Sequence, residues 1–105
     1  TGTLTRETRF PEGDWRGPYF TPQHLDATLT RVERLSPLVP TGSTLPDLAL
    51  RFILSCPDVS TVIPGMRKAR HVDANLGAST RGPLDASLVD ALRAHRWNRV
   101  PNQTA

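Results

Sequence analysis

The residues with the clearest chemical potential lie between Val62 and Asn75, where basic side chains follow a Pro-Gly turn. Arg67, Lys68 and Arg70 stand at the expected start of a helix. Unpaired backbone N–H groups and the helix dipole favour an anion at that end and disfavour cations. Arg and Lys also supply charge and two-pronged hydrogen bonds to a phosphate. The pattern therefore predicts a phosphate site, and a solvated basic surface is the competing interpretation.

Two expected elements would position this cluster. A β-branched run bounded by Pro and Gly predicts a strand over residues 59–63, the one clear strand of the chain. A helix pattern resumes from about Lys68 to Ala78, and Gly65 between them lets a ligand approach the backbone closely. The cluster would thus follow the carboxyl end of a strand, where α/β sheets bind their ligands. A single strand cannot satisfy its own backbone groups, so the rest of its sheet must come from elsewhere.

The rest of the chain predicts helices joined by loops. Residues 1–20 hold closely spaced Pro and Gly residues together with aromatic side chains, which indicates a long ordered loop. Thr-Pro and Thr-Leu-Pro-Asp sequences predict helix starts at Thr21 and Thr44. A last helix is expected from about Asp85 to Trp97, and residues 100–105 are expected to be a frayed tail.

Length and composition limit the class of protein. The chain has 105 residues, 37% of them hydrophobic and 22% charged, which fits one folded domain and excludes a charge-dominated disordered chain. Its formal net charge of +3 is a mild basic excess. The single Cys56 excludes an internal disulfide framework, and three scattered His residues predict no metal site. The lone free Cys56 indicates a reducing compartment, so we expect a cytoplasmic location. No apolar run approaches the ~20 residues that span a bilayer, so we expect no membrane partner. Because the chain opens on Thr1 without an initiator Met, a processed start and a piece of a longer protein both stay open.

Several segments together resemble the C-terminal portion of the aldo/keto reductases, in its bacterial form. They are Leu48–Ser55, Val59–Gly65 followed by Arg67, Val72 and Asn75, and Gly82-Pro83-Leu84 before Leu92–Trp97. The opening Thr1-Gly2-Thr3 is similar to the Thr-Gly that follows barrel strand seven. The resemblance covers the chain to about residue 99.

The resemblance implies an α/β fold, namely the C-terminal fragment of a (β/α)8 TIM barrel that is mostly helical. Residues 1–20 would be the loop after strand seven. Residues 21–99 would supply the helix seven region, strand eight, helix eight and the terminal helix. A full barrel needs about 250 residues, so 105 residues cannot close one.

The resemblance also implies an NADP(H)-dependent oxidoreductase, in which hydride passes between the cofactor and a small-molecule carbonyl or alcohol. In the family's pattern, Gly65 and Met66 offer turn backbone to the adenosine phosphate and Arg67 pairs with it. His71 assists from the first helical turn, and Asn75 meets the adenine.

The sequence departs from the family's pattern in three ways. Ala74 stands where many members carry Glu, so one adenosine contact is expected to be missing. Many members have Lys at the position of Gly65, so Arg67 would have to carry that charge. The family's catalytic Asp, Tyr, Lys and His lie on earlier strands, so we expect no catalytic residue here. The fragment alone is expected to be inactive and poorly stable.

Two other classes of function stay open. Arg93, Arg96 and Arg99 lie three apart on the expected last helix, which would make a stripe suited to a small nucleic-acid-binding module. The small net charge and the absence of a helix-turn-helix or RNA-binding signature argue against a nucleic-acid partner. The second class is a non-catalytic interaction domain that completes another chain. Exposed barrel surface would in that case also favour self-association.

Overall fold

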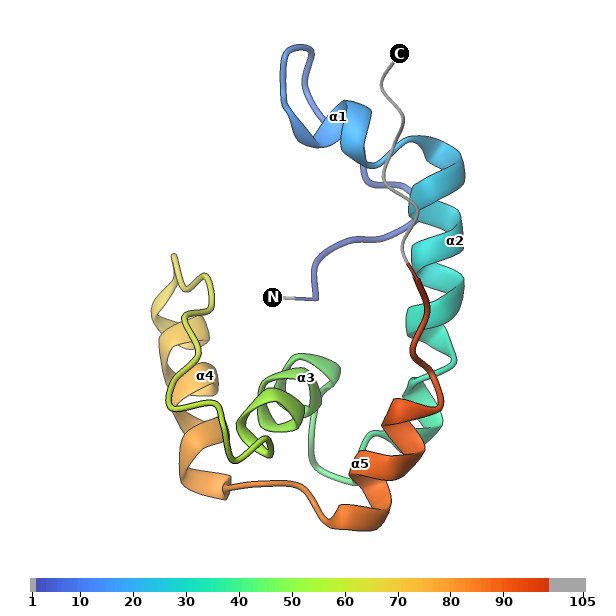
Figure 1. The fold of residues 1–105 in the computed structure, drawn as a ribbon. Coiled ribbons are helices and arrows are strands. Elements are labelled where there is room, and N and C mark those ends of the chain that lie inside the picture. Colours follow the sequence, from blue (N-terminus) through green and yellow to red (C-terminus); the bar gives the residue numbers. More distant parts are fainter. Residues whose placement is uncertain (1, 99–105) are drawn as a thin grey trace.

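The computed structural model describes residues 2–98, which form a set of short helices arranged as an open arc (Figure 1). In chain order these are α1 (Arg16–Tyr19), α2 (Pro22–Glu33), the 3-10 turn η1 (Ser36–Leu38), α3 (Leu45–Leu54), α4 (Ala69–Arg81) and α5 (Ala86–Arg93). Helices α2 and α4 lie on opposite arms of the arc, with α3 between them, and the N-terminal segment runs inside it.

The starts of α2 and α3 confirm the predicted caps. The Thr21 hydroxyl accepts a hydrogen bond from the His24 N–H at 3.4 Å, and Thr44 accepts one from the Asp47 N–H at 3.3 Å. Each cap satisfies one backbone donor that a helix cannot satisfy itself. Proline in the first turn of both helices costs no hydrogen bond.

The core is small and centres on the packing of α3 against α4. Its buried apolar side chains are Leu48 on α3, Ala78 on α4, Leu84 after α4 and Leu25 on α2. Ile63, by contrast, is 90% exposed. The apolar surface removed from water is therefore modest.

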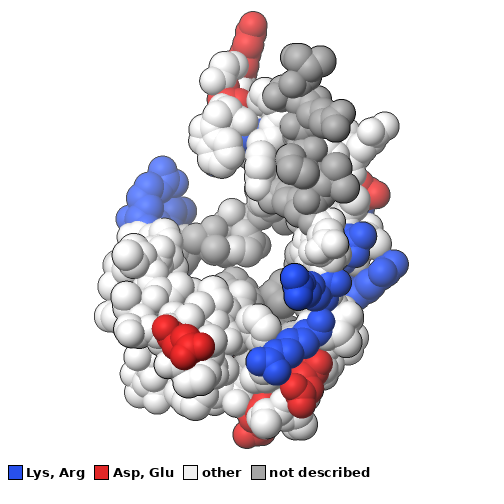
Figure 2. All heavy atoms as spheres, viewed as in Figure 1, with Lys and Arg blue, Asp and Glu red and all other residues white. Residues whose placement is uncertain are grey.

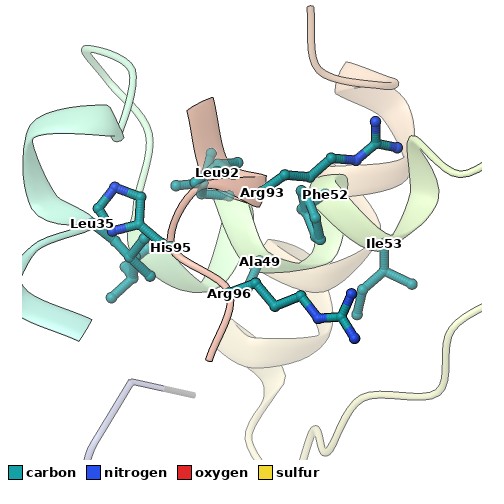
Figure 3. Close-up of a pocket in the computed structure, with 10 residues that line it drawn as sticks. Leu35, Ala49, Phe52, Ile53, Leu92, Arg93, His95 and Arg96 are labelled. Carbon is teal, nitrogen blue, oxygen red and sulfur yellow. The ribbon is translucent and has the colours of Figure 1, made fainter. Parts of the chain in front are cut away.

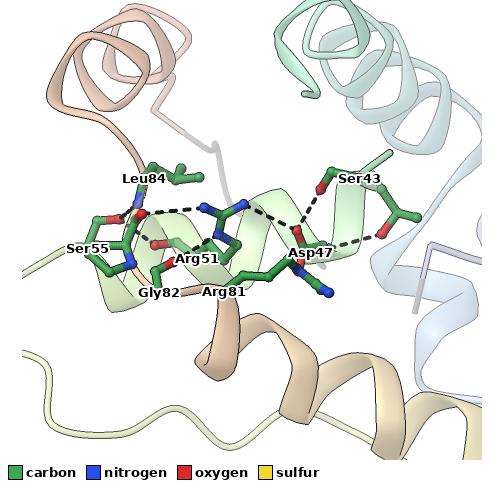
Figure 4. Close-up of polar contacts among 9 residues, drawn as sticks. Ser43, Asp47, Arg51, Ser55, Arg81, Gly82 and Leu84 are labelled. Atoms are coloured by element: carbon green, nitrogen blue, oxygen red, sulfur yellow. Dashed lines mark hydrogen bonds and ion pairs between the residues drawn. The ribbon is translucent and has the colours of Figure 1, made fainter. Parts of the chain in front are cut away.

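A buried carboxylate joins α3 to α4 (Figure 4). Asp47, only 6% exposed, accepts hydrogen bonds from the Ser43 hydroxyl at 2.6 Å and from Arg81 Nε at 3.1 Å. Arg51 Nη1 lies 3.7 Å from the same carboxylate. Burial by itself would raise the pKa of Asp47, but the bonds from Arg81 and Ser43 and the charges of Arg81 and Arg51 hold it below its ordinary value.

The link between α4 and α5 is fastened to the same helix. Arg51 Nε donates to the Gly82 carbonyl at 2.9 Å, and the Leu84 N–H donates to the Ser55 hydroxyl at 2.8 Å. Gly82, at φ 79°, adopts the left-handed conformation that ends α4. α3 thus holds the far end of α4 and leaves its first turn facing outward.

The expected strand over residues 59–63 is not formed, and the described residues contain no strand. A strand needs a neighbour to pair its N–H and C=O groups. The single backbone bond from this run joins the Val59 N–H to the Cys56 carbonyl, within a turn. The prediction of one clear strand was wrong for residues 2–98, because residues 59–63 carry the strand pattern but pair with no neighbouring strand there.

Two further differences concern local structure. The region predicted as loop, residues 1–20, contains the single turn α1, where the Asp14 carboxylate accepts from the Arg16 N–H at 2.9 Å. The last helix ends at Arg93, four residues before the predicted Trp97. Arg96 therefore lies beyond it, and Arg99 of the predicted arginine stripe lies outside the described residues.

Candidate functional site

The predicted phosphate segment folds into a shallow pocket of about 260 Å³ in front of α4. Gly65, Met66 and Arg67 come from the turn, Lys68 and Arg70 from the start of α4, and His71 from its first turn. Thr3 completes the wall from the N-terminal segment. Figure 2 shows basic side chains gathered over this end of α4, at the upper left of the molecule.

The first turn of α4 is not capped by the chain. Lys68 stands at the cap position, and its side chain makes no capping hydrogen bond. The first turn contains no acidic residue. No acceptor among residues 2–98 takes a hydrogen bond from the backbone N–H of Gly65, Met66 or Arg67. Gly65, Met66 and Arg67 line the pocket, and the first turn of α4 beside them has no negative group from the described chain.

The cations beside the pocket have no acidic partner in the part of the chain that the structure describes. Arg67, Lys68 and Arg70 are exposed and form no ion pair there. His71 is half-buried among them. Partial desolvation, followed by the charges of Arg70, Lys68 and Arg67, lowers the pKa of His71 below its ordinary value. The site therefore holds a surplus of positive charge that an anion would relieve.

Gly65 leaves open space in front of the turn. A Cβ at this position would meet no atom within 4 Å, so the surrounding protein does not require glycine there. The space lies beside the free backbone donors, where a ligand group could approach.

Asn75 lies one step away from the pocket. Its Nδ2 donates to the Gly65 carbonyl at 3.4 Å, and its side chain lines a second cavity of about 220 Å³ that Met66 shares. The structure thus places Gly65, Met66, Arg67 and His71 around one pocket and ties Asn75 to it through the turn. Thr3 was singled out in the sequence only as part of the Thr1-Gly2-Thr3 opening; its place at this pocket was missed, because it lies 62 positions before Gly65.

The model of the aldo/keto reductase family matches residues 4–96. The chain belongs to the aldo/keto reductase family. No curated protein and no solved structure matched it. Aldo/keto reductases are oxidoreductases that use nicotinamide nucleotides to act on small molecules, and their fold is the (β/α)8 barrel. The described helices are accordingly part of such a barrel.

In the described part of this aldo/keto reductase segment, Tyr19, His24 and Lys68 do not line a common pocket. Tyr19 in α1 and His24 in α2 lie on the opposite arm of the arc from Lys68 (Figure 1). The described residues contain no cluster of three His, Cys, Asp or Glu side chains that could hold a metal ion. No helix in the described range is long and apolar enough to cross a membrane. The arrangement is suited to holding an anion.

Proposed function

We propose that this chain is the C-terminal, NADP(H)-binding part of an aldo/keto reductase barrel. The complete enzyme would transfer hydride between NADP(H) and a carbonyl or alcohol. The uncapped, basic first turn of α4 carries the proposal, since a phosphate supplies both the missing hydrogen-bond acceptor and the missing negative charge. NADP(H) differs from NAD(H) by one such phosphate, on the 2′-oxygen of the adenosine.

Each residue around the pocket has a role in this proposal. The guanidinium of Arg67 pairs with the 2′-phosphate, and the N–H groups of Gly65 and Met66 donate to its oxygens. Lys68 and Arg70 add charge without needing a fixed geometry. Desolvation and then the charges of Arg70, Lys68 and Arg67 lower the pKa of His71, and a bound dianion would shift that pKa upward.

Asn75 would contact the adenine with its amide already oriented. Its Nδ2 is directed at the Gly65 carbonyl, which leaves Oδ1 as an acceptor for the 6-amino group of adenine. The same hydrogen bond ties the phosphate turn to α4. Base and phosphate recognition would thus be coupled through one side chain.

The chemistry of hydride transfer would depend on the rest of the barrel. The bound nicotinamide supplies the hydride, and this segment's residues position the cofactor's adenosine end. Isolated residues 1–105 are expected to show no reductase activity. The cytoplasmic location stays a prediction.

The nucleic-acid alternative rested on an arginine stripe along the last helix, and α5 ends at Arg93, so Arg96 does not lie on that helix. An interaction domain that completes another chain agrees with the barrel fragment. That role does not by itself account for the exposed cations at the uncapped start of α4.

The test compares NADPH with NADH in the wild type and in Arg67→Ala, by calorimetric titration of the chain or of the complete enzyme that contains it. Loss of charged hydrogen bonds should weaken NADPH binding by about 10- to 100-fold. NADH binding should change less than about twofold, as should both affinities in Arg93→Ala, which removes an exposed arginine on α5. Equal losses for the two nucleotides would show that Arg67 does not bind the 2′-phosphate.

A further inference from the structure

The apolar groove between α3 and α5, of about 460 Å³, is a face on which the remainder of a barrel would pack (Figure 3). Phe52, Ile53 and Leu92 line it, and Ile53 is 41% exposed. In a (β/α)8 barrel the helices form a ring around the strands, so neighbouring elements of the same barrel would cover such side chains. A further role is indicated instead by the N-terminal segment, residues 2–9.

The N-terminal segment contacts three different parts of the fold. Gly2 lies against Pro46 at the start of α3, where a Cβ on Gly2 would come within 3.1 Å of Pro46 Cγ. Its φ of 67° also favours glycine. Thr3 then lines the phosphate pocket in front of α4, and Arg6 reaches α2. Figure 1 shows the segment crossing the interior of the arc toward α2. One short run of chain thus links the phosphate pocket to α2.

Arg6 is bound to α2 through all three nitrogens of its guanidinium. Nε lies 3.1 Å from Asp26 Oδ1, Nη2 donates to Thr30 Oγ1 at 3.2 Å, and Glu33 accepts from both terminal nitrogens. These three partners stand four and three residues apart, so they share one face of α2. A single exposed ion pair contributes little, but a guanidinium held by two carboxylates and a hydroxyl forms a network with a defined geometry.

A turn of the N-terminal segment fixes the backbone around Arg6. The Thr8 N–H donates to the Thr5 carbonyl at 3.1 Å, and the Thr5 N–H donates to the Thr8 hydroxyl at 2.8 Å. Arg9 Nη1 donates to the Arg6 carbonyl at 3.0 Å. Three residues of extended chain span at most about 10 Å, so Thr3 cannot move far while Arg6 is bound to α2. The place of Thr3 at the pocket therefore depends on a contact made on another helix.

We propose that Thr3 is a further contact of the 2′-phosphate and that Arg6 is the positioning residue that holds Thr3 at the pocket. This inference rests on the proposed function, because the ligand is the nucleotide assigned to that pocket. A threonine hydroxyl can donate to a phosphate oxygen, and Thr3 lines the same pocket as Arg67 and His71. The Arg6 network orders the segment before the nucleotide arrives, so binding does not have to supply that ordering. The outer helix α2 would thus influence nucleotide affinity without touching the nucleotide.

A double-mutant cycle tests whether Arg6 acts through Thr3. The probe is adenosine 2′,5′-bisphosphate, titrated by calorimetry into the chain or into the complete enzyme that contains it. Arg6→Ala and Thr3→Ala should each weaken binding about three- to fivefold. The double variant should bind like Thr3→Ala alone, because the effects of coupled residues do not add. Arg93→Ala, which removes an exposed ion pair on α5, should stay within about twofold of wild type.

A charge exchange separates the ion-pair network from a general loss of structure. Arg6→Glu places a third carboxylate beside Asp26 and Glu33 and should weaken the bisphosphate more than Arg6→Ala does. Adding Glu33→Arg to Arg6→Glu should recover most of that loss, because it restores an attraction between the segment and α2. Circular dichroism of each variant verifies that its helices are retained.

A measurement without ligand follows the position of the segment itself. In the free protein, Arg6→Ala should move the amide signals of Met66, Arg67 and His71, which lie around the pocket that Thr3 lines. Arg93→Ala should leave those signals in place. Unchanged signals in Arg6→Ala would show that Arg6 does not control the segment at the pocket.

The affinities distinguish failure of this inference from failure of the proposed function. If Arg67→Ala weakens the bisphosphate and Arg6→Ala stays within twofold of wild type, the nucleotide site stands and the role of Arg6 is refuted. Losses that multiply in the double variant would show that Arg6 does not act through Thr3. If Arg67→Ala is also without effect, the nucleotide site is wrong, and the inference fails with it.

Discussion

The first turns of α3 and α4 have opposite electrostatic surroundings. α3 begins with the Thr44 cap and the buried Asp47, whose carboxylate is bonded by Ser43 and Arg81. α4 begins with the uncapped Lys68, surrounded by exposed cations. One helix start is satisfied internally and contributes to the core. The other remains unsatisfied by the described chain and is available to a ligand.

The difference shows how a helix start can be assigned to structure or to binding. A negative group at α3 is favoured by the helix dipole, by its hydrogen bonds and by its ion pairs, all within the protein. At α4 the dipole and the side chains are both positive, an arrangement that costs stability until an anion binds. Each prediction below alters one side of this comparison.

The largest expected effect follows the loss of the internal acid. Asp47→Ala leaves Arg51 and Arg81 without their shared carboxylate and should lower the free energy of unfolding by about 3 kcal/mol. Because the folded-state pKa of Asp47 is lowered, its contribution is present above the ordinary value of 3.8 and is lost as pH falls through the lowered pKa. Urea unfolding at decreasing pH should show the two proteins converging in acid.

The control for this change is Asp73→Ala, an exposed acid on α4. It should alter the free energy of unfolding by less than about 0.5 kcal/mol. An Asp47→Ala variant as stable as this control would show that the Asp47 carboxylate at the start of α3 does not stabilise the fold.

A smaller effect follows from giving α4 the cap that α3 has. Lys68→Ser should raise the free energy of unfolding by about 1 kcal/mol, because a serine hydroxyl can accept from the exposed amides. The same change should weaken NADPH binding and leave NADH binding within about twofold. Thermal unfolding with and without each nucleotide measures both effects.

The reciprocal change, Thr44→Lys, should destabilise α3 by about 1 kcal/mol. If Lys68→Ser stabilised the protein without weakening NADPH binding, the uncapped start of α4 would be a structural defect and not a ligand site.

The smallest expected effect is the pH dependence of nucleotide binding. His71 has a folded-state pKa below 6.5 because of desolvation and of Arg70, Lys68 and Arg67, so it is neutral in the free protein at pH 7. A bound dianion raises that pKa, so binding takes up a proton and strengthens as pH falls. Between about pH 8 and 6.5, above the second pKa of a phosphate near 6, NADPH affinity should rise about two- to fivefold.

Two comparisons isolate His71 in that titration. NADH, which lacks the 2′-phosphate, should show a flat profile over the same range. His71→Gln keeps a polar side chain and should flatten the NADPH profile. A slope that persists in His71→Gln would assign the proton to another group.

Sequence predicted the local features and missed those that depend on distant partners. The Thr-Pro start of α2, the Thr-Leu-Pro-Asp start of α3 and the basic turn at Arg67 are local patterns, and the structure contains all three. The Asp47 cap position could be predicted, but its bond to Arg81, 34 residues later, could not. Residues 59–63 carry a strand pattern, but a strand forms only with a pairing partner, and the described part of the chain offers none.

The ends of elements were also set by tertiary contacts. The last helix stops at Arg93, and beyond it Trp97 packs on Arg31 of α2, a contact that no local pattern indicates. No local pattern indicates the place of Thr3 in the pocket wall either, because only the fold brings Thr3 beside Gly65.

The most direct test of the central claim is an amide chemical-shift map of the ¹⁵N-labelled chain, titrated with adenosine 2′,5′-bisphosphate and, separately, with adenosine 5′-phosphate. The account predicts that the largest shifts fall on Gly65, Met66, Arg67 and His71, and only with the 2′-phosphorylated compound. Shifts of equal size with both compounds, or centred on Arg31, Arg34 and Arg96, would contradict it.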